Sequence, residues 1–294
     1  MSEEAFARHR SLLFTVAYEM LGSAADAEDA VQETWLRWAD LDDERRAEVR
    51  DPRAYLVRIV TRQALNRLRS LARRKEDYVG EWLPEPLLTS PDVAEDVELA
   101  ESVSIAMLTV LETLTPTERA VFVLREVFDV PYDEIAVAVD KSPAAVRQIA
   151  HRAKDHVAAR RPRMEVVRSE HEEAVERFVA ALNTGDVQGL MDVLAPDVVS
   201  VADGGGKVRG AARRPIVGAD RIARYLIGGL AKFTGEIVAS PTWVNGQPGI
   251  RVELDGRLAG VVSLNVEDGR ITRIYSMANP DKLGWLVAEA ELAR

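Results

Sequence analysis

The stretch from residue 131 to residue 161 holds side chains that could read a DNA sequence. It reads as two short helices joined by a tight turn. Ser142 and Pro143 suit the start of the second helix, because serine caps helix N-termini and proline tolerates the first helical position. That helix presents donors for base edges: Arg147, Gln148, His151 and Arg152. The pattern predicts a helix-turn-helix whose second helix enters the major groove, and the alternative is a helical hairpin with a solvated basic face.

A second basic segment lies between residues 53 and 75, where arginines are frequent and acids are absent. Arginine and asparagine can contact phosphates and base edges, although a solvated basic face is again the alternative. The candidates are Arg58, Arg62, Asn66 and Arg69. Residues 81–118 carry acids and no base, so an acidic connector separates the two basic segments. The net charge of −10 does not exclude DNA binding, because phosphates sense charges within about 10 Å.

An acidic helix is predicted for residues 24–39, with Ser23 as its N-cap. Val31, Trp35 and Leu36 are expected on its apolar side. The polar side, which could bind a basic partner, carries Asp26, Glu28, Asp29, Gln32 and Glu33. Acids in a first turn also favour the helix dipole, so a solvated acidic face is the structural alternative.

Composition limits the class of protein. The chain has 294 residues, enough for two or three domains, and no cysteine, which excludes disulfides and cysteine-ligated zinc. Four scattered histidines do not form a metal site, and no cofactor is expected. The first twenty residues do not resemble a signal peptide, and no apolar run is long enough for a membrane span. We therefore expect a cytoplasmic protein that does not contact a membrane.

The pattern along the chain predicts helices first and a sheet afterwards. Helices are expected at 3–21, 24–39, 53–75, 93–113 and 117–128, followed by the helix-turn-helix. A linker rich in proline begins at Asp77, and Pro162 marks a second boundary. Beyond it we expect helices at 168–183, 186–194, 218–231 and 280–292, and strands at 197–202, 236–244, 248–254, 258–266 and 270–277.

The order of the motifs DAEDAVQETWLR, YLVRIVTRQALNRLR, an acidic linker and LTPTERAVF…SPAAVRQIAHRAK resembles a bacterial RNA polymerase sigma factor of the extracytoplasmic-function (ECF) group over residues 5–161. The resemblance implies that the acidic helix binds RNA polymerase core through the β′ clamp coiled coil, that β and β′ are partners, and that this contact is made by Asp26, Asp29, Gln32, Glu33 and Trp35. It also implies that Arg58, Arg62, Asn66 and Arg69 recognise the −10 promoter element, and that the helix-turn-helix reads the −35 element.

The part after residue 166 is similar to the cone-shaped SnoaL-like (NTF2-like) fold. Three short motifs are similar to the SigJ-like group of sigma factors with a fused domain of this kind: WLPEPL, DGGGK and NPDKL. We expect regulatory contacts from the following residues: Trp82, Leu83, Pro84, Asp203, Gly204, Gly205, Gly206, Lys207, Asn279, Pro280, Asp281, Lys282 and Leu283. The three motifs are expected to lie near one another, and Trp82, Leu83 and Leu87 are expected to be buried.

The expected architecture is therefore multidomain, with two all-α sigma domains followed by an α+β SnoaL-like domain. The boundaries are region 2 at 1–76, a linker at 77–96, region 4 at 97–162 and the SnoaL-like domain at 166–294. The expected function is promoter-specific initiation of transcription, regulated by the chain's own C-terminal domain, without enzymatic activity. The alternative is a DNA-binding regulator whose SnoaL-like domain binds or converts a small molecule.

Overall fold

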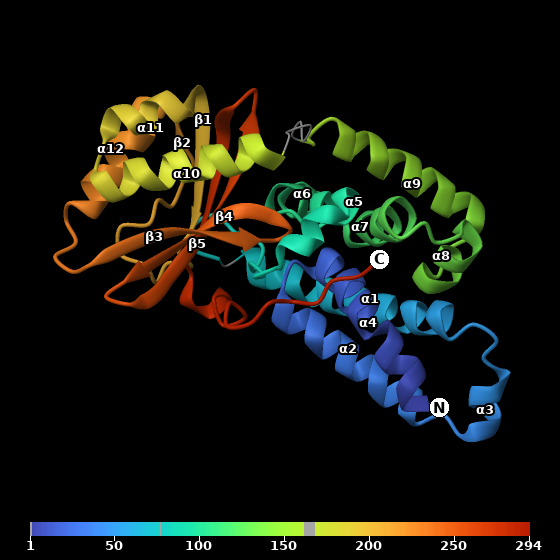
Figure 1. The fold of residues 1–294 in the computed structure, drawn as a ribbon. Coiled ribbons are helices and arrows are strands. Elements are labelled where there is room, and N and C mark those ends of the chain that lie inside the picture. The colour runs from blue at the N-terminus through green and yellow to red at the C-terminus, as the bar shows by residue number, and fades with distance from the viewer. Residues whose placement is uncertain (1, 77, 162–167) are drawn as a thin grey trace. The chain divides into compact units, whose positions relative to one another are not determined.

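The computed structural model describes residues 2–76, 78–161 and 168–294, which form two compact units (Figure 1). The helical unit comprises Met1–Glu76, Met107–Arg161 and Glu291–Arg294. The α+β unit comprises Asp77–Ala106 and Pro162–Ala290. The boundaries expected at Asp77 and Pro162 lie outside the described residues. None of the helices in the described ranges is long and apolar enough to cross a lipid bilayer.

The helical unit is built from α1 (Ser2–Leu21), α2 (Ala24–Ala39), α3 (Asp43–Glu48), α4 (Pro52–Glu76), most of α6 (Ile105–Leu111), α7 (Pro116–Phe122), the π-helical turn η2 (Val123–Val127), α8 (Tyr132–Val139) and α9 (Pro143–Ala158). The sequence sets several of these ends. Gly22 has a φ of 65° after α1, and the Ser23 hydroxyl accepts from the Asp26 N–H at the start of α2. Ser142 caps α9 in the same way, through the Ala145 N–H.

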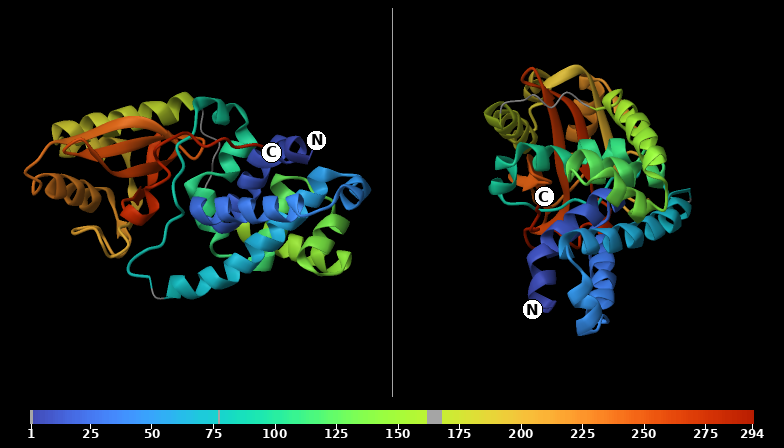
Figure 2. Two further views of the ribbon diagram at one scale, coloured as in Figure 1. Left: turned by 90° about the horizontal axis from the view of Figure 1, so that it is seen from below. Right: turned by 90° about the vertical axis from the view of Figure 1, so that its right-hand side faces the viewer.

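Two groups of helices form the core of the helical unit. Helices α1, α2 and α4 pack side by side, as the two views of Figure 2 show, and bury Leu13, Val16, Leu56 and Val60 completely. Helices α7, α8 and α9 form the second group, in which α8 and α9 make the expected helix-turn-helix around residues such as Ile135 and Val146. Helix α4 also contacts α7 and α8, so the two groups belong to one body.

The α+β unit has a six-stranded curved sheet. Its elements are η1 (Pro91–Glu95), α5 (Val97–Ser102), α10 (Arg168–Thr184), α11 (Val187–Val193), β1 (Leu194–Asp203), β2 (Ile216–Val217), α12 (Ala219–Leu230), β3 (Ile237–Val244), β4 (Gln247–Leu254), β5 (Arg257–Glu267), β6 (Arg270–Met277) and η3 (Pro280–Lys282). The strand order is β2-β1-β6-β5-β4-β3. Only the β1–β6 pair is parallel, and the three hairpins from β3 to β6 are antiparallel, as their turn sequences predict.

Both faces of this sheet are covered. Helices α10, α11 and α12 cover one face, where Phe178, Ile222, Ile250 and Ile274 are buried (Figures 1 and 2). A second apolar cluster lies on the other face and includes side chains from residues 78–106, which we call the connecting segment. Its buried members are Leu83, Ile105, Ala106, Val244, Val261, Tyr275, Met277, Leu283 and Leu286. The connecting segment is therefore part of the fold of the α+β unit.

Three expected helices differ in the structure. The helix expected at 280–292 is wrong, because the chain makes only the short turn η3 there. Leu283 and Leu286 then pack on the sheet, and the Ala290 N–H donates to the Leu88 carbonyl at 2.8 Å. The helix expected at 93–113 is divided into η1, α5 and α6, and the helix expected at 117–128 continues beyond Phe122 as a π-helical turn. Helix α3 and strand β2 were not expected.

Candidate functional site

The acidic surface of α2 is held by one arginine of α4. The Arg67 guanidinium lies 3.3 Å from Asp26 Oδ1, 3.2 Å from Asp29 Oδ2 and 2.8 Å from Glu33 Oε1. Asp29 and Gln32 are exposed, and Asp26 and Glu33 are half-buried. One cation shared by three carboxylates reduces their mutual repulsion and keeps them on one face. The sequence placed Arg67 in the basic segment without this role.

The apolar side of α2 differs from the expectation in one residue. Trp35 packs with its ring centre 5.0 Å from that of Phe6, and Val31 is buried. Leu36, expected on the same buried side, is 65% exposed. It follows Asp29 and Glu33 at helical spacing, so it extends the acidic surface with an apolar contact point. Its exposure leaves it accessible to a partner that binds the acidic surface.

The predicted −10 residues lie along α4 with their side chains at the surface. Asn66 and Arg69 are exposed, and the Arg58 guanidinium lies over the Tyr55 ring, 5.0 Å from its centre. Arg62 is engaged inside the helical unit, because its Nη2 donates to the Val137 carbonyl of α8 at 2.8 Å. The first helix of the helix-turn-helix thus contacts the helix that carries these candidates.

A buried arginine joins the same two groups of helices. Arg119 of α7 is 2% exposed, and its Nε donates to the Glu19 carbonyl of α1 at 2.8 Å. Its Nη1 binds Glu112 Oε1 at 2.8 Å. Elsewhere an open pocket of about 730 Å³ lies among residues of α3, α4 and α8 and the adjoining turns. Arg119 therefore adds polar bonds to the contact that buried apolar side chains such as Val121 and Leu124 make between the two groups.

The predicted −35 residues form an exposed row on α9. Arg147, Gln148, His151 and Arg152 are all exposed, while Val146, the residue before them, is completely buried. The Arg147 guanidinium lies 5.5 Å from the centre of the Tyr132 ring, and His151 Nδ1 lies 2.8 Å from Asp155 Oδ2. The side that carries the donors is thus open, as a recognition helix requires.

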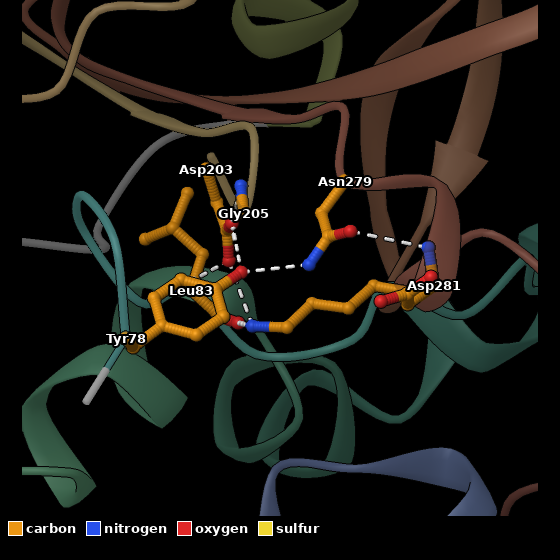
Figure 3. A network of polar contacts seen from close by, with 7 residues as sticks. Tyr78, Leu83, Asp203, Gly205, Asn279 and Asp281 are labelled. Atoms are coloured by element: carbon orange, nitrogen blue, oxygen red, sulfur yellow. Dashed lines mark hydrogen bonds and ion pairs between the residues drawn. The ribbon is translucent and has the colours of Figure 1, made fainter. Parts of the chain in front are cut away.

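The motifs WLPEPL, DGGGK and NPDKL come together around Asp203, which is completely buried at the end of β1 (Figure 3). Its Oδ1 accepts from the Tyr78 hydroxyl at 2.5 Å and from the Gly205 N–H at 3.1 Å. Its Oδ2 accepts from the Leu83 N–H at 2.9 Å and from Lys282 Nζ at 2.7 Å. Each carboxylate oxygen therefore has two donors, and these donors come from WLPEPL, DGGGK, NPDKL and the residue Tyr78.

Lys282 is the cation of this network and is 4% exposed. Its Nζ also donates to the Leu83 carbonyl at 2.6 Å and lies 3.4 Å from the centre of the Trp82 ring. A desolvated cation over an aromatic face is stabilised by about 2 kcal/mol or more. The expected burial of this part of the chain is seen at Leu83 and Leu87, which are 1% exposed, whereas Trp82 is half-buried.

Tyr78 connects Asp203 to the NPDKL motif. Its hydroxyl accepts from Asn279 Nδ2 at 2.7 Å, and burial followed by the hydrogen bond to Asp203 raises the pKa of Tyr78 above its ordinary value. Asn279 Oδ1 in turn accepts from the Asp281 N–H, so Asn279 caps the start of η3. No sequence pattern points to Tyr78, because it precedes the WLPEPL motif in a segment without periodicity.

The glycines of DGGGK allow a close approach to NPDKL. A Cβ atom on Gly205 would lie 2.4 Å from the Asn279 amide nitrogen, and one on Gly206 would lie 3.0 Å from Val79. Both glycines have a positive φ, which favours glycine in any case. Lys207 and Asp281 form an ion pair at the rim, where both side chains are exposed. Pro84 is buried beside Leu83, and Pro280 is exposed.

The single histidine of the described part of the α+β unit is buried on the opposite side of the sheet. His171 is 8% exposed, and its Nε2 has no hydrogen-bond partner among the described residues. Burial lowers the pKa of His171 from 6.5 to about 4, against a smaller opposite effect of its hydrogen bond to the Leu264 backbone. The folded state therefore holds His171 neutral.

Acidification is expected to weaken the α+β unit through His171. The unfolded chain binds a proton below about pH 6.5, whereas the folded chain does so only near pH 4, so stability falls as the pH decreases through this interval. At pH 5 the loss is about 2 kcal/mol relative to neutral pH. Urea unfolding at pH 7 and pH 5 should show this difference reduced in His171→Leu and retained in His151→Ala, whose histidine is exposed. An unchanged pH dependence in His171→Leu would contradict the assignment.

Two groups of helices, the second with a helix-turn-helix, together with a C-terminal α+β domain define the architecture of a sigma factor with a fused C-terminal domain. Residues 5–74 match the Sigma-70 region 2 family, residues 104–157 match Sigma-70 region 4, and residues 175–274 match the SnoaL-like domain family.

Relatives extend over nearly the whole chain. ECF RNA polymerase sigma factor SigJ of Mycobacterium tuberculosis is 37% identical, and the match covers 96% of this chain and 93% of that protein. The probable ECF RNA polymerase sigma factor SigI of the same organism is 33% identical over 97% of this chain and 96% of its own. The crystal structure of M. tuberculosis SigJ matches with a TM-score of 0.75 and 35% identity, covering 96% of this chain and 98% of that one.

The chain therefore belongs to the ECF sigma factors of RNA polymerase, and it carries a fused SnoaL-like domain. Proteins of this family bind RNA polymerase core and promoter DNA, and this chain acts as a sigma factor.

Proposed function

We propose that this sigma factor regulates its own promoter binding, and that the SnoaL-like domain does so by holding the connecting segment. The observation that carries the proposal is the buried Asp203–Lys282 pair, which binds the backbone N–H and carbonyl of Leu83. The chain between the two promoter-binding regions is thereby built into a folded domain. Its first part, residues 78–83, is fixed as long as these bonds are made.

The spacing of the promoter elements explains why holding the connecting segment would prevent promoter binding. Elements at −35 and −10 are about 25 base pairs apart, which is about 85 Å along B-DNA. A compact unit of the size of the helical unit is about 40 Å across. Because α4 contacts α8 within that unit, its two groups of helices must separate before they reach both elements.

The connecting segment is long enough to permit this separation once it is released. About 30 extended residues span roughly 100 Å, which exceeds the distance between the elements. While the segment is held, α7–α9 stay at high effective concentration near α1–α4. Release lowers that concentration and favours the open form.

The finer contacts follow the family assignment. We propose that Asp26, Asp29, Gln32, Glu33 and Trp35 bind the β′ clamp coiled coil, and the exposure of Leu36 supports adding it to this surface. The exposed row on α9 is proposed to read the −35 element. Arg58, Arg62, Asn66 and Arg69 are proposed to read the −10 element, and Arg62 becomes available only when its bond to Val137 breaks.

A small-molecule ligand for the SnoaL-like domain stays a prediction with less support. The face beneath α10–α12 is filled by apolar side chains, and Phe178, Ile250 and Ile274 are at most 1% exposed. Residues suited to acid–base chemistry are engaged elsewhere, since Asp203 lies on the opposite face and binds the connecting segment. The regulatory role therefore explains more of the buried polar groups.

Transcription with purified core polymerase tests the proposal. Three forms are compared on candidate promoters: the full chain, a chain that stops after Lys282 and a chain that stops after Arg161. The form that stops after Lys282 loses Leu283, Leu286 and the Ala290–Leu88 bond, so its connecting segment is held less firmly and it is expected to initiate severalfold more than the full chain. Equal activity of all three forms would contradict self-regulation. Absence of promoter-dependent initiation by every form would contradict the roles given to α4 and α9.

A further inference from the structure

The turn between β3 and β4 differs from the other tight turns of the same sheet. Three two-residue turns have a positive φ at both residues, as type I′ hairpin turns require: Asn245-Gly246, Asp255-Gly256 and Asp268-Gly269. Asp255 and Asp268 are exposed, whereas Asn245 is completely buried. Aspartate and asparagine both satisfy this turn geometry, and Asn245 differs from the two aspartates in the burial of its side chain.

The Asn245 side chain binds the connecting segment at two separate points. Its Oδ1 accepts from the Leu87 N–H at 2.9 Å, and its Nδ2 donates to the Val103 carbonyl at 2.8 Å. Its backbone N–H donates to the Leu87 carbonyl at 3.0 Å. Aspartate could accept the first bond, but only an amide can also donate the second.

Gly246 completes the contact on the neighbouring side. Its N–H donates to the Thr89 hydroxyl at 2.9 Å, and Thr89 is buried. A Cβ atom at this position would lie 2.8 Å from the Ala100 Cα and 3.0 Å from its Cβ, so no side chain fits against α5. Corresponding Cβ atoms on Gly256 and Gly269 would meet nothing within 4 Å. Both residues of the turn are therefore adapted to the connecting segment.

We infer that the Asn245-Gly246 turn is a second latch on the connecting segment, which holds residues 87–103 independently of the Asp203 network. The Asp203 network binds residues 78–83, and the two sets of hydrogen bonds share no residue. Along the sequence, the residues held by the first latch follow the end of α4, and those held by the second latch precede the start of α6. Opening the second latch alone would release residues 87–103, which precede α7–α9 in the sequence, while residues 78–83 stay bound.

This inference rests on the proposed function for its regulatory meaning, but not for its geometry. Asn245→Asp in the full chain is the sharpest test, because it keeps a turn that the sheet accepts, removes the donor to Val103 and places a buried carboxylate oxygen against that carbonyl. Hydrogen–deuterium exchange should become at least tenfold faster in the amides of residues 87–103 and stay unchanged in residues 78–83. Asp203→Asn should give the opposite pattern. Asp268→Asn, the reverse exchange in an exposed turn, is the matched control and should change neither segment.

Equal acceleration of both segments in Asn245→Asp, or no acceleration, would overturn the second latch. If exchange also rises across β3 and β4, the hairpin itself is damaged. In that case Thr89→Val replaces Asn245→Asp in the same comparison of residues 87–103 with residues 78–83. This variant leaves the turn intact and removes the Thr89 hydroxyl that accepts from the Gly246 N–H. Transcription with core polymerase separates the two proposals. Selective exchange with unchanged initiation would support the latch and refute its regulatory role, whereas absent selectivity refutes the latch whatever the transcription shows.

Discussion

Replacing Lys282 by methionine is expected to destabilise the SnoaL-like domain by about 3–5 kcal/mol, because it leaves the carboxylate of Asp203 buried without its cation. Methionine has a similar length but cannot donate to Asp203 or to the Leu83 carbonyl, so the connecting segment loses its strongest bonds. The residual donors on Asp203 are the Tyr78 hydroxyl and two backbone N–H groups. These are neutral and compensate only in part.

Urea unfolding measures the loss of stability, and cleavage by a glutamate-specific protease measures release of the connecting segment, which contains Glu81 and Glu85. We expect cleavage there to become at least tenfold faster. Lys207→Met is the matched control, because Lys207 and Asp281 form an exposed pair that contributes about 1 kcal/mol or less. The double variant Asp203→Asn with Lys282→Met should lose less stability than the two single variants together. Equal effects of Lys282→Met and Lys207→Met would contradict the role of the buried pair.

Replacing Arg119 by methionine is expected to separate the two groups of helices in the helical unit and to destabilise it by about 3–5 kcal/mol. The guanidinium is buried and carries the bond to the Glu19 carbonyl, together with the ion pair to Glu112. Its loss leaves a carbonyl of α1 without this donor and removes a bond between α7 and α1.

Small-angle scattering of the free protein measures this separation as an increase in the radius of gyration. Arg125→Met is the control, because the contacts of Arg125 with described residues are all to nearby groups of its own region, which are Asp129, the Val130 carbonyl and the Tyr132 ring. We expect Arg125→Met to keep the radius of the unaltered protein. An unchanged radius in Arg119→Met, with the domain still folded by circular dichroism, would show that Arg119 does not hold the two groups together.

Much of the fold could be predicted because its signals are local. Helix caps such as Ser23 and Ser142, and turns such as Asp255-Gly256, act over a few residues and appear in the structure as expected. The helix expected at 280–292 failed because its apolar spacing fits a helix, while Leu283 and Leu286 are in fact held by the sheet. Local pattern cannot show which distant surface a leucine will meet.

The polar contacts of the sites were harder to predict for the same reason. Asp203 and Lys282 are far apart in the sequence. The motifs indicated that each residue is important, but they did not predict that the two form an ion pair. Asn245 was visible only as a turn residue, although its amide binds a segment more than a hundred residues earlier. Arg67 and Arg119 look like ordinary surface arginines of helices, and only tertiary packing shows that each joins two helices.

The distance between α4 and the helix-turn-helix in the free protein tests the central claim most directly. The chain has no cysteine, so single cysteines at the exposed positions Ser70 and Lys141 can carry spin labels without a background signal. The account predicts one narrow, short distance in the otherwise unaltered protein, and a broad distribution extending to longer distances in Lys282→Met and in Arg119→Met. A broad distribution in the unaltered protein, or a narrow one that Lys282→Met leaves unchanged, would contradict the claim that the held connecting segment keeps the two promoter-binding regions together.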